Sequence, residues 1–332
     1  MKSTIQAAIF LIALLGTPLF SQTIINMGTV APEGSPWHGI LMRMKEDWDK
    51  ASGGKVVLRV FANGRQGDES QMLRLVRQGT TLHAVALSGA GLAQVDNSVN
   101  ALHIPLMMNS YAELDYVRKQ IEPKLERAIE AKNLVVLNWS DVGWVYFFTK
   151  KQARTLDDIR TLKLFTTAGD PDTEQLYKEL RFKPVPSGAE ELMTNLRTGF
   201  IEAFYVPPLF ALVNQSFGIA KYMIDMKWSS LIGATLISRR AWERVPATLR
   251  PELLRIARNA GEEFRTKIRA SGDEAIAEMA KKQLQIIKLS DAELAKWRNE
   301  TSAAYPKLKE KLVPADLFDE VERLLKEFRA RK

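Results

Sequence analysis

The chain has 332 residues, of which 46% are hydrophobic and 26% charged, a composition typical of a globular protein long enough for two domains. Lys and Arg outnumber Asp and Glu by 47 to 39, which gives a formal net charge of +8. Because acidic residues are interleaved with the basic ones along helical stretches such as 255–282, we interpret these charges as solvated helix faces and expect no nucleic-acid partner.

The first 21 residues differ in pattern from the rest of the chain. Lys2 is followed by an apolar run at 7–15, and the segment ends at Ser21. This pattern is typical of a signal peptide with cleavage near Ser21 and Gln22, because a membrane span needs about 20 apolar residues and this run is shorter. We therefore expect export to the periplasm. The sequence contains no cysteine, which excludes disulfides and an acylated-cysteine anchor.

The first part of the chain predicts alternating strands and helices. A strand at 24–29 precedes a helix that Ser35 caps and that ends at Gly53, followed by a strand at 56–61. The elements expected next are a helix at 71–78, a buried strand at 84–88, a glycine-bearing loop at 88–91, helices from Ser110 and from Pro123, and a strand at 134–139. The glycine-bearing loop either lets the backbone approach a ligand or is a simple turn.

A second lobe is expected to begin near Trp144. Its predicted strands are at 144–149, 162–165, 183–185 and 202–205. Its predicted helical segments are a short turn opened by a capping box at Thr155 and Asp158, a helix that Asp170 caps through Leu180, a helix capped by Ser187 with Glu190 at its third position, and a helix capped by Ser290 with Glu293. Beyond a strand at 234–237 and Pro246, a helical pattern continues to about Gln283. At 1.5 Å per residue it spans roughly 50 Å, enough to bridge both lobes, with Gly261 and Gly272 as points for a bend.

These elements predict an α/β fold of two lobes, each a mainly parallel sheet flanked by helices, with the long helix crossing both. We assign residues 22–143 with 233–270 to lobe I, and residues 144–232 with 271–332 to lobe II.

Several short phrases of the chain occur in the order known from one family of proteins. They are Ser35-Pro36-Trp37-His38, 51–56, 64–69, 76–80, Ile104-Pro105-Leu106-Met107, 156–164 and 196–203. Together, over nearly all of residues 24 to 300, they resemble the solute-binding component of TRAP (tripartite ATP-independent periplasmic) transporters. The resemblance implies a periplasmic binding protein fold that closes on a small-molecule solute and docks on the TRAP membrane subunits. It also implies that the chain is no enzyme.

The chain departs from this family at one informative position. Family members usually place an arginine after the strand phrase Leu-Lys-Ile, where its planar fork grips a ligand carboxylate, whereas this chain has Phe165. Positions Leu87 and Tyr205-Val206 are also apolar here. The candidate ligand-binding residues are Trp37, Leu87, Ser88, Gly89, Trp144, Phe165, Thr166, Thr167, Gly169, Tyr205, Val206 and Trp228.

Three interpretations of these residues stay open. In the first, Phe165, Tyr205, Trp144 and Leu87 enclose an apolar or aromatic ligand. In the second, hydroxyls of Thr166 and Thr167 and the amides around Gly169 hold an anion without an arginine. In the third, the aromatic and aliphatic side chains are simply core.

Other chemistry finds little support in the sequence. The three histidines, His38, His83 and His103, are far apart and lack metal-ligand spacing, and there is no phosphate-binding glycine loop or nucleophile elbow. We expect no metal and no cofactor. A lipid-carrying or scaffold protein on the same fold is the alternative function, and a hydrolase or lyase is less supported.

Overall fold

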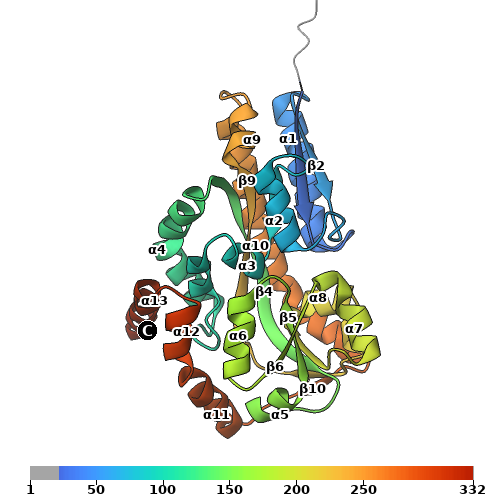
Figure 1. The fold of residues 1–332 in the computed structure, drawn as a ribbon, viewed down its shortest axis with the longest axis vertical. Coiled ribbons are helices and arrows are strands. Elements are labelled where there is room, and N and C mark those ends of the chain that lie inside the picture. The colour runs from blue at the N-terminus through green and yellow to red at the C-terminus, as the bar shows by residue number, and fades with distance from the viewer. Residues whose placement is uncertain (1–21, 332) are drawn as a thin grey trace, which may run out of the picture.

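The computed structural model describes residues 22–331, and its upper part in Figure 1 is built on three parallel strands. The strand β1 (Thr23–Thr29) pairs with both β2 (Val56–Phe61) and β3 (Ala84–Leu87). Helices α1 (Pro36–Ser52) and α2 (Glu69–Gln78) connect them. The predicted first βαβ unit is confirmed.

Local capping explains where the first helix begins and ends. The Ser35 hydroxyl accepts a hydrogen bond from the His38 amide, and Pro36 occupies the first turn. At the other end, Gly53 adopts a left-handed φ of 58°, and its amide donates to carbonyls of the last turn. Both boundaries follow from residues next to the helix, which is why the sequence predicts them.

Two long antiparallel strands join the upper and lower parts of the molecule. β4 (Leu134–Thr149) pairs with β9 (Ser229–Ser238) from Leu134 opposite Ser238 to Val145 opposite Ser229. The prediction of separate strands at 134–139 and 144–149 is therefore wrong. Register shifts at Val136/Asn138 and Asp141/Gly143 are bulges that carry one strand through the polar stretch between them.

The lower sheet is mixed rather than mainly parallel. β5 (Lys163–Thr167) pairs parallel with β6 (Lys183–Ser187) and β7 (Ala203–Val206), and β8 (Tyr222–Ile224) pairs parallel with β10 (Gln285–Ile287). The pairings of β4 with β7, β8 and β9, and of β3 with β9, are antiparallel. The two long strands that belong to both parts cause this mixture.

The long helix α10 (Arg250–Lys281) crosses both parts of the molecule, as predicted, and packs on α1, on β4 and on α8 (Pro208–Val213) (Figure 1). Gly261 marks a close approach: a Cβ there would lie 2.6 Å from the Trp139 carbonyl oxygen. At Gly272, in contrast, no described atom lies within 4 Å of such a Cβ.

The remaining helices cover the sheets and the left side of Figure 1. They are α3 (Gly89–Ala93), α4 (Tyr111–Glu130), α5 (Leu156–Thr161), α6 (Pro171–Glu179), α7 (Leu192–Thr198), α9 (Arg239–Arg244), α11 (Asp291–Ser302), α12 (Tyr305–Lys311) and α13 (Ala315–Ala330), with 3-10 turns at Asn97–Leu102, Ala189–Glu191 and Ser216–Gly218. The C-terminal segment contacts both parts, because α12 packs on α6 and α13 on α4.

Three local predictions are corrected by these helices. α4 continues through Pro123 instead of restarting there. The predicted glycine-bearing loop is the start of α3. The segment after Ser187 begins as a 3-10 turn, in which Glu191, not Glu190, accepts from the Ser187 hydroxyl and the Gly188 amide. The capping boxes at Thr155/Asp158 and Ser290/Glu293 are confirmed.

A buried ion network lies where β4 passes between the two parts. Asp141 is 1% exposed and accepts hydrogen bonds from Arg118 of α4 and Arg269 of α10. Arg269 also donates two hydrogen bonds of 2.7 Å to Asp115 and stacks on Tyr111, 4.1 Å from the ring centroid. The network ties α4, β4 and α10 together at this crossing.

The predicted signal peptide lies outside the described residues. Across residues 22–331, none of the helices combines the length and the apolar character that a membrane crossing requires.

Candidate functional site

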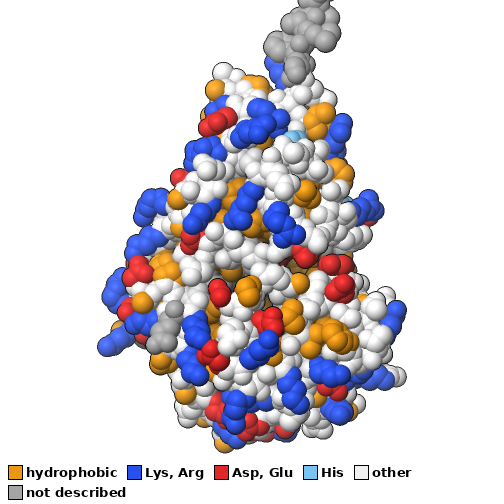
Figure 2. Space-filling model, in the orientation of Figure 1, with side chains coloured by type: hydrophobic (Ala, Val, Ile, Leu, Met, Phe, Trp, Pro, Cys, Tyr) orange, Lys and Arg blue, Asp and Glu red, His pale blue; other side chains and the backbone are white. Residues whose placement is uncertain are grey.

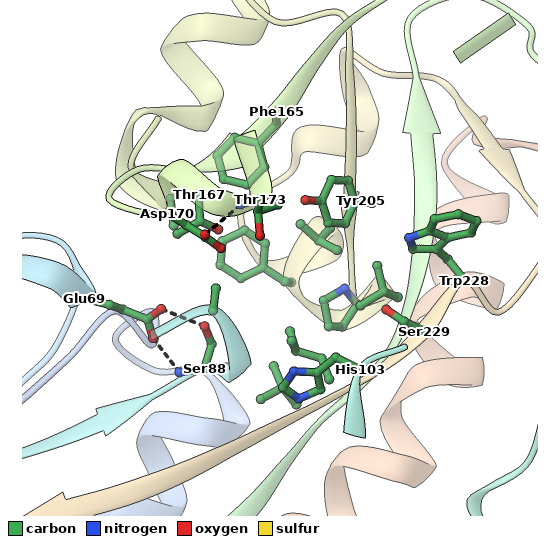
Figure 3. A pocket seen from close by; sticks show the side chains of 18 of the residues that line it. Glu69, Ser88, His103, Phe165, Thr167, Asp170, Thr173, Tyr205, Trp228 and Ser229 are labelled. Atoms are coloured by element: carbon green, nitrogen blue, oxygen red, sulfur yellow. Dashed lines mark hydrogen bonds between the residues drawn. The ribbon is translucent and has the colours of Figure 1, made fainter. Parts of the chain in front are cut away.

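A cavity of about 340 Å³ lies among the carboxyl ends of strands from both sheets (Figure 3). Thr29, Ser88, Thr167 and Pro207, which line it, stand at or just after the ends of β1, β3, β5 and β7. Ligands of open α/β sheets bind at this end of the strands, and the volume is at the lower end of the range for small-molecule sites. The cavity is therefore the candidate binding site.

Apolar side chains from both sheets form much of its wall. Phe165 of β5 is 7% exposed, and Val206 of β7 is 8% exposed. Leu87 of β3, in the other sheet, and Trp37 of the helix α1 also line it. The Trp37 indole Nε1 is buried without a hydrogen-bond partner among the described residues and does not reach the cavity surface, so Trp37 contributes apolar wall.

Three aromatic residues that line the cavity lie together, and two of them, Tyr205 and Trp228, are labelled in Figure 3. The ring centroids of Tyr177 and Tyr205 are 6.0 Å apart, and the Tyr177 hydroxyl interacts with the Tyr205 hydroxyl and the Trp228 indole. Burial raises the pKa of the Tyr205 hydroxyl well above its ordinary range, and burial also raises that of Tyr177. Both phenols thus stay neutral and present rigid rings with polar edges to the cavity.

On the opposite side, Glu69 fixes the start of α3. Its carboxylate accepts from the Ser88 amide at 2.5 Å and from the Ser88 hydroxyl at 2.7 Å (Figure 3). Burial raises the pKa of Glu69, while the bonds from Ser88 and from the Gly91 amide oppose that rise. Because the Ser88 proton is committed to Glu69, the hydroxyl can meet a ligand only as an acceptor.

His103 lies at the floor of the cavity as a neutral imidazole. Its Nε2 accepts from the Ile232 amide at 3.2 Å, which leaves the ring proton on Nδ1. Burial lowers the pKa of His103 to about 4. The ring lies directly over Gly89, where a Cβ would stand 2.1 Å from the imidazole Cε1. Gly89 is thus needed to seat His103.

The charged lining is predominantly acidic. Asp170 caps α6, accepting from the Thr173 amide at 3.0 Å, and both side chains line the cavity. Arg160 is the only Arg or Lys among the described lining residues, and it is paired with Asp157 at 2.7 Å and Glu300 at 3.1 Å. Acidic side chains also lie beside the hollow at the centre of Figure 2. An anion in the cavity would therefore meet carboxylates and no free cation in this described lining.

Comparison with known proteins identifies the family. The sequence profile of bacterial extracellular solute-binding protein family 7 matches residues 27–311. The chain belongs to this family, the solute-binding proteins of TRAP transporters. Its members are solute receptors rather than enzymes, and the family's description places them outside the cytoplasm.

Individual relatives are distant in sequence but close in fold. An uncharacterized protein of Haemophilus influenzae is 23% identical over 278 residues, covering 81% of this chain and 82% of that protein. The sugar acid binding protein of Advenella mimigardefordensis in complex with galactonate superposes with a TM-score of 0.85 at 20% identity, over 92% of this chain and 99% of that one. A Ralstonia eutropha TRAP protein with bound (S)-2-acetolactate gives 0.84 at 18% identity, over 92% and 99%.

Most residues expected to bind the solute of this TRAP receptor line the cavity. They are Trp37, Leu87, Ser88, Phe165, Thr167, Tyr205, Val206 and Trp228. The other four expected residues are not among the lining residues. Gly89 lies under His103, and Trp144 packs on Tyr111 with ring centroids 5.3 Å apart. Thr166 is 1% exposed, and a Cβ at Gly169 would stand 2.2 Å from the Ser70 hydroxyl of α2.

Sequence reasoning missed several polar lining residues, among them Glu69, His103, Asp170, Thr173 and Ser229. For Asp170 the signal was present, because the residue was predicted as a helix cap at the end of a strand. For His103 the local sequence carries no such signal, since its position depends on Gly89 and on the Ile232 amide.

Proposed function

We propose that this TRAP receptor captures a compact solute with an apolar or aromatic body and no negative charge near α6. Phe165 carries the proposal, because it stands where family members usually have a carboxylate-binding arginine. The neutralised Arg160 and the nearby Asp170 support the same conclusion. Burying the solute against Phe165, Tyr205 and Val206 contributes about 25 cal/mol for each Å² removed from water.

Hydrogen-bonding groups around the cavity limit the orientation of such a solute. The His103 Nδ1–H is a donor, whereas the Ser88 hydroxyl and the Asp170 carboxylate are acceptors. A neutral polar group, such as an amide or a hydroxyl, offers both functions. We therefore expect a solute with one apolar part and one neutral polar group.

A small organic acid is the second candidate, because the relatives described above hold galactonate and acetolactate. In this chain such an acid would depend on the Thr167 hydroxyl and the His103 Nδ1–H. The amides at the start of α6 are less suited to it, since Asp170 occupies that end of the helix. Of the anion site predicted at Thr166, Thr167 and Gly169, only Thr167 lines the cavity.

The physiological setting is also part of the proposal. Residues 1–21 direct the chain to the periplasm, where lobe I (22–143 with 233–270) and lobe II (144–232 with 271–332) close on the solute. The closed receptor then docks on the TRAP membrane subunits. The match to family 7 supports this setting.

A thermal-shift screen of the chain from Gln22 onward tests the ligand class. The panel contains neutral aromatic and alkyl amides, aromatic acids, and sugar acids. A compound at 100 times its dissociation constant stabilises the folded state by about 2.7 kcal/mol, a readily measured shift. We expect stabilisation by the amides. Shifts with sugar acids alone would favour the organic-acid candidate.

A further inference from the structure

The cavity extends beyond the space between the sheets and follows one face of α6. Thr173, Leu176, Tyr177 and Leu180 all line it, at the i, i+3, i+4 and i+7 spacing of a single helical face. Thr173 stands at the cleft beside Asp170 (Figure 3), and Leu180 caps the opposite end of the helix. At 1.5 Å per residue, the lining face is about 10 Å long.

The C-terminal helices provide the facing wall. The lining residues on this side are Thr301 of α11, Ala304, Leu308 of α12, Leu312 and Val313. We call the space between these residues and the α6 face the annex. Leu308 and Val313 are buried, and Ala304 is half-buried, so the wall is part of the packed interior rather than an open surface.

The annex is almost entirely apolar. Among the C-terminal residues that line it, the one polar side chain is Thr301, whose hydroxyl is buried and has no hydrogen-bond partner among the described residues, and the α6 face adds the hydroxyls of Thr173 and Tyr177. At the far end, Leu156 and Phe182 line the cavity together with the Arg160–Glu300 ion pair. Ordered water is poorly stabilised in such an apolar space, because a buried water molecule needs two or more polar partners.

We propose that the annex binds an alkyl or aryl tail of the solute whose neutral polar group lies in the cleft near Ser88 and Thr167. This inference rests on the proposed function and extends it from a compact apolar body to a tailed amphiphile of limited length. The annex and the cleft belong to the same cavity, so a solute held in the cleft can extend its tail into the annex. Each buried methylene would tighten binding by about fourfold.

Ion pairs fix the length of the annex. Arg160 of α5 pairs with Glu300 of α11, and Lys311 of α12 pairs with Glu179 of α6. These pairs hold both walls together at the end remote from the cleft. The gain in binding affinity per methylene should therefore stop at a defined chain length. Partitioning into a lipid-like phase, in contrast, would continue to strengthen with each added methylene.

Isothermal titration calorimetry with straight-chain primary amides, from butanamide to decanamide, tests the proposal. Wild-type protein should bind the series about fourfold more tightly per methylene until the annex is full. Ala304→Phe places a large ring in the annex and should abolish this dependence on chain length. The matched control is Ala303→Phe, because Ala303 is exposed and is not among the lining residues.

A second variant keeps the test informative if Ala304→Phe disturbs folding. Leu308→Ala shortens a side chain of the annex wall, so the chain length at which affinity stops rising should increase. Thermal unfolding of each variant without ligand measures its stability separately.

The outcomes separate the annex from the function it extends. If no amide binds, the proposed ligand class is wrong. If butanamide and decanamide bind the wild type equally, or Ala304→Phe keeps the dependence on chain length, the annex takes no tail and only this inference is overturned. If affinity rises with every added methylene up to decanamide, the annex is not closed at its far end.

Discussion

Acidification should destabilise the protein through His103, by an amount that the structure specifies. The folded-state pKa of this buried imidazole is about 4, below its ordinary value of 6.5. Between these two pH values the unfolded chain takes up a proton that the folded chain does not, so stability falls as pH falls. Each pH unit removes at most about 1.4 kcal/mol, which gives roughly 3 kcal/mol across the window.

Urea denaturation at several pH values between pH 7 and pH 4 measures this effect in the wild type and in His103→Gln. The glutamine carbonyl can accept from the Ile232 amide but does not titrate. As the pH falls from 7 to 4, the free energy of unfolding of the variant should decrease by up to about 3 kcal/mol less than that of the wild type. Identical pH dependence of the two proteins would refute the assignment of a buried neutral His103.

Two further stability predictions concern α10 and β4, both measured by urea denaturation at neutral pH. Gly261→Ala should lower the free energy of unfolding by about 1–3 kcal/mol, because its Cβ would meet the Trp139 carbonyl, whereas Gly272→Ala should raise it by up to about 1 kcal/mol. Equal effects would contradict the close packing. Asp141→Ala should cost about 2–3 kcal/mol, because Arg118 and Arg269 lose their shared buried carboxylate and keep only Asp115 and Glu122, while Glu262→Ala, which removes an exposed ion pair, should cost under about 1 kcal/mol. Similar costs would rule out the buried network.

Helix boundaries were predictable because their determinants are local. Ser35, Thr155, Asp170 and Ser290 cap helices through bonds to amides three residues later. The family resemblance likewise used short phrases in a fixed order. Both kinds of signal are readable without knowing which segments meet in space.

The continuity of β4 and the position of His103 were not predictable in this way. Asp141 would interrupt a strand if its charge were unpaired, but Arg118 and Arg269 from two distant helices compensate it. His103 sits over Gly89, and only that packing makes both residues part of the site or its support. Pairings between remote segments decide these features.

Only the part of the cavity lining that lies at the ends of predicted strands could be predicted from the sequence. Phe165 and Tyr205 lie on strands whose carboxyl ends meet at the site, so strand prediction places them correctly. The annex depends on α12 packing against α6, a contact between segments far apart in sequence. The Asp170 cap predicted the helix α6, but the sequence did not predict which segment packs against it.

Calorimetric titration of phenylpropanamide and galactonate into wild-type protein and Phe165→Arg tests the ligand class most directly. We expect the wild type to bind the amide and not the sugar acid. In Phe165→Arg the new charge lies against the apolar body of the amide, so amide binding should weaken by tenfold or more, about 1.4 kcal/mol. Saturable binding of galactonate to the wild type without binding of the amide would contradict the proposed function.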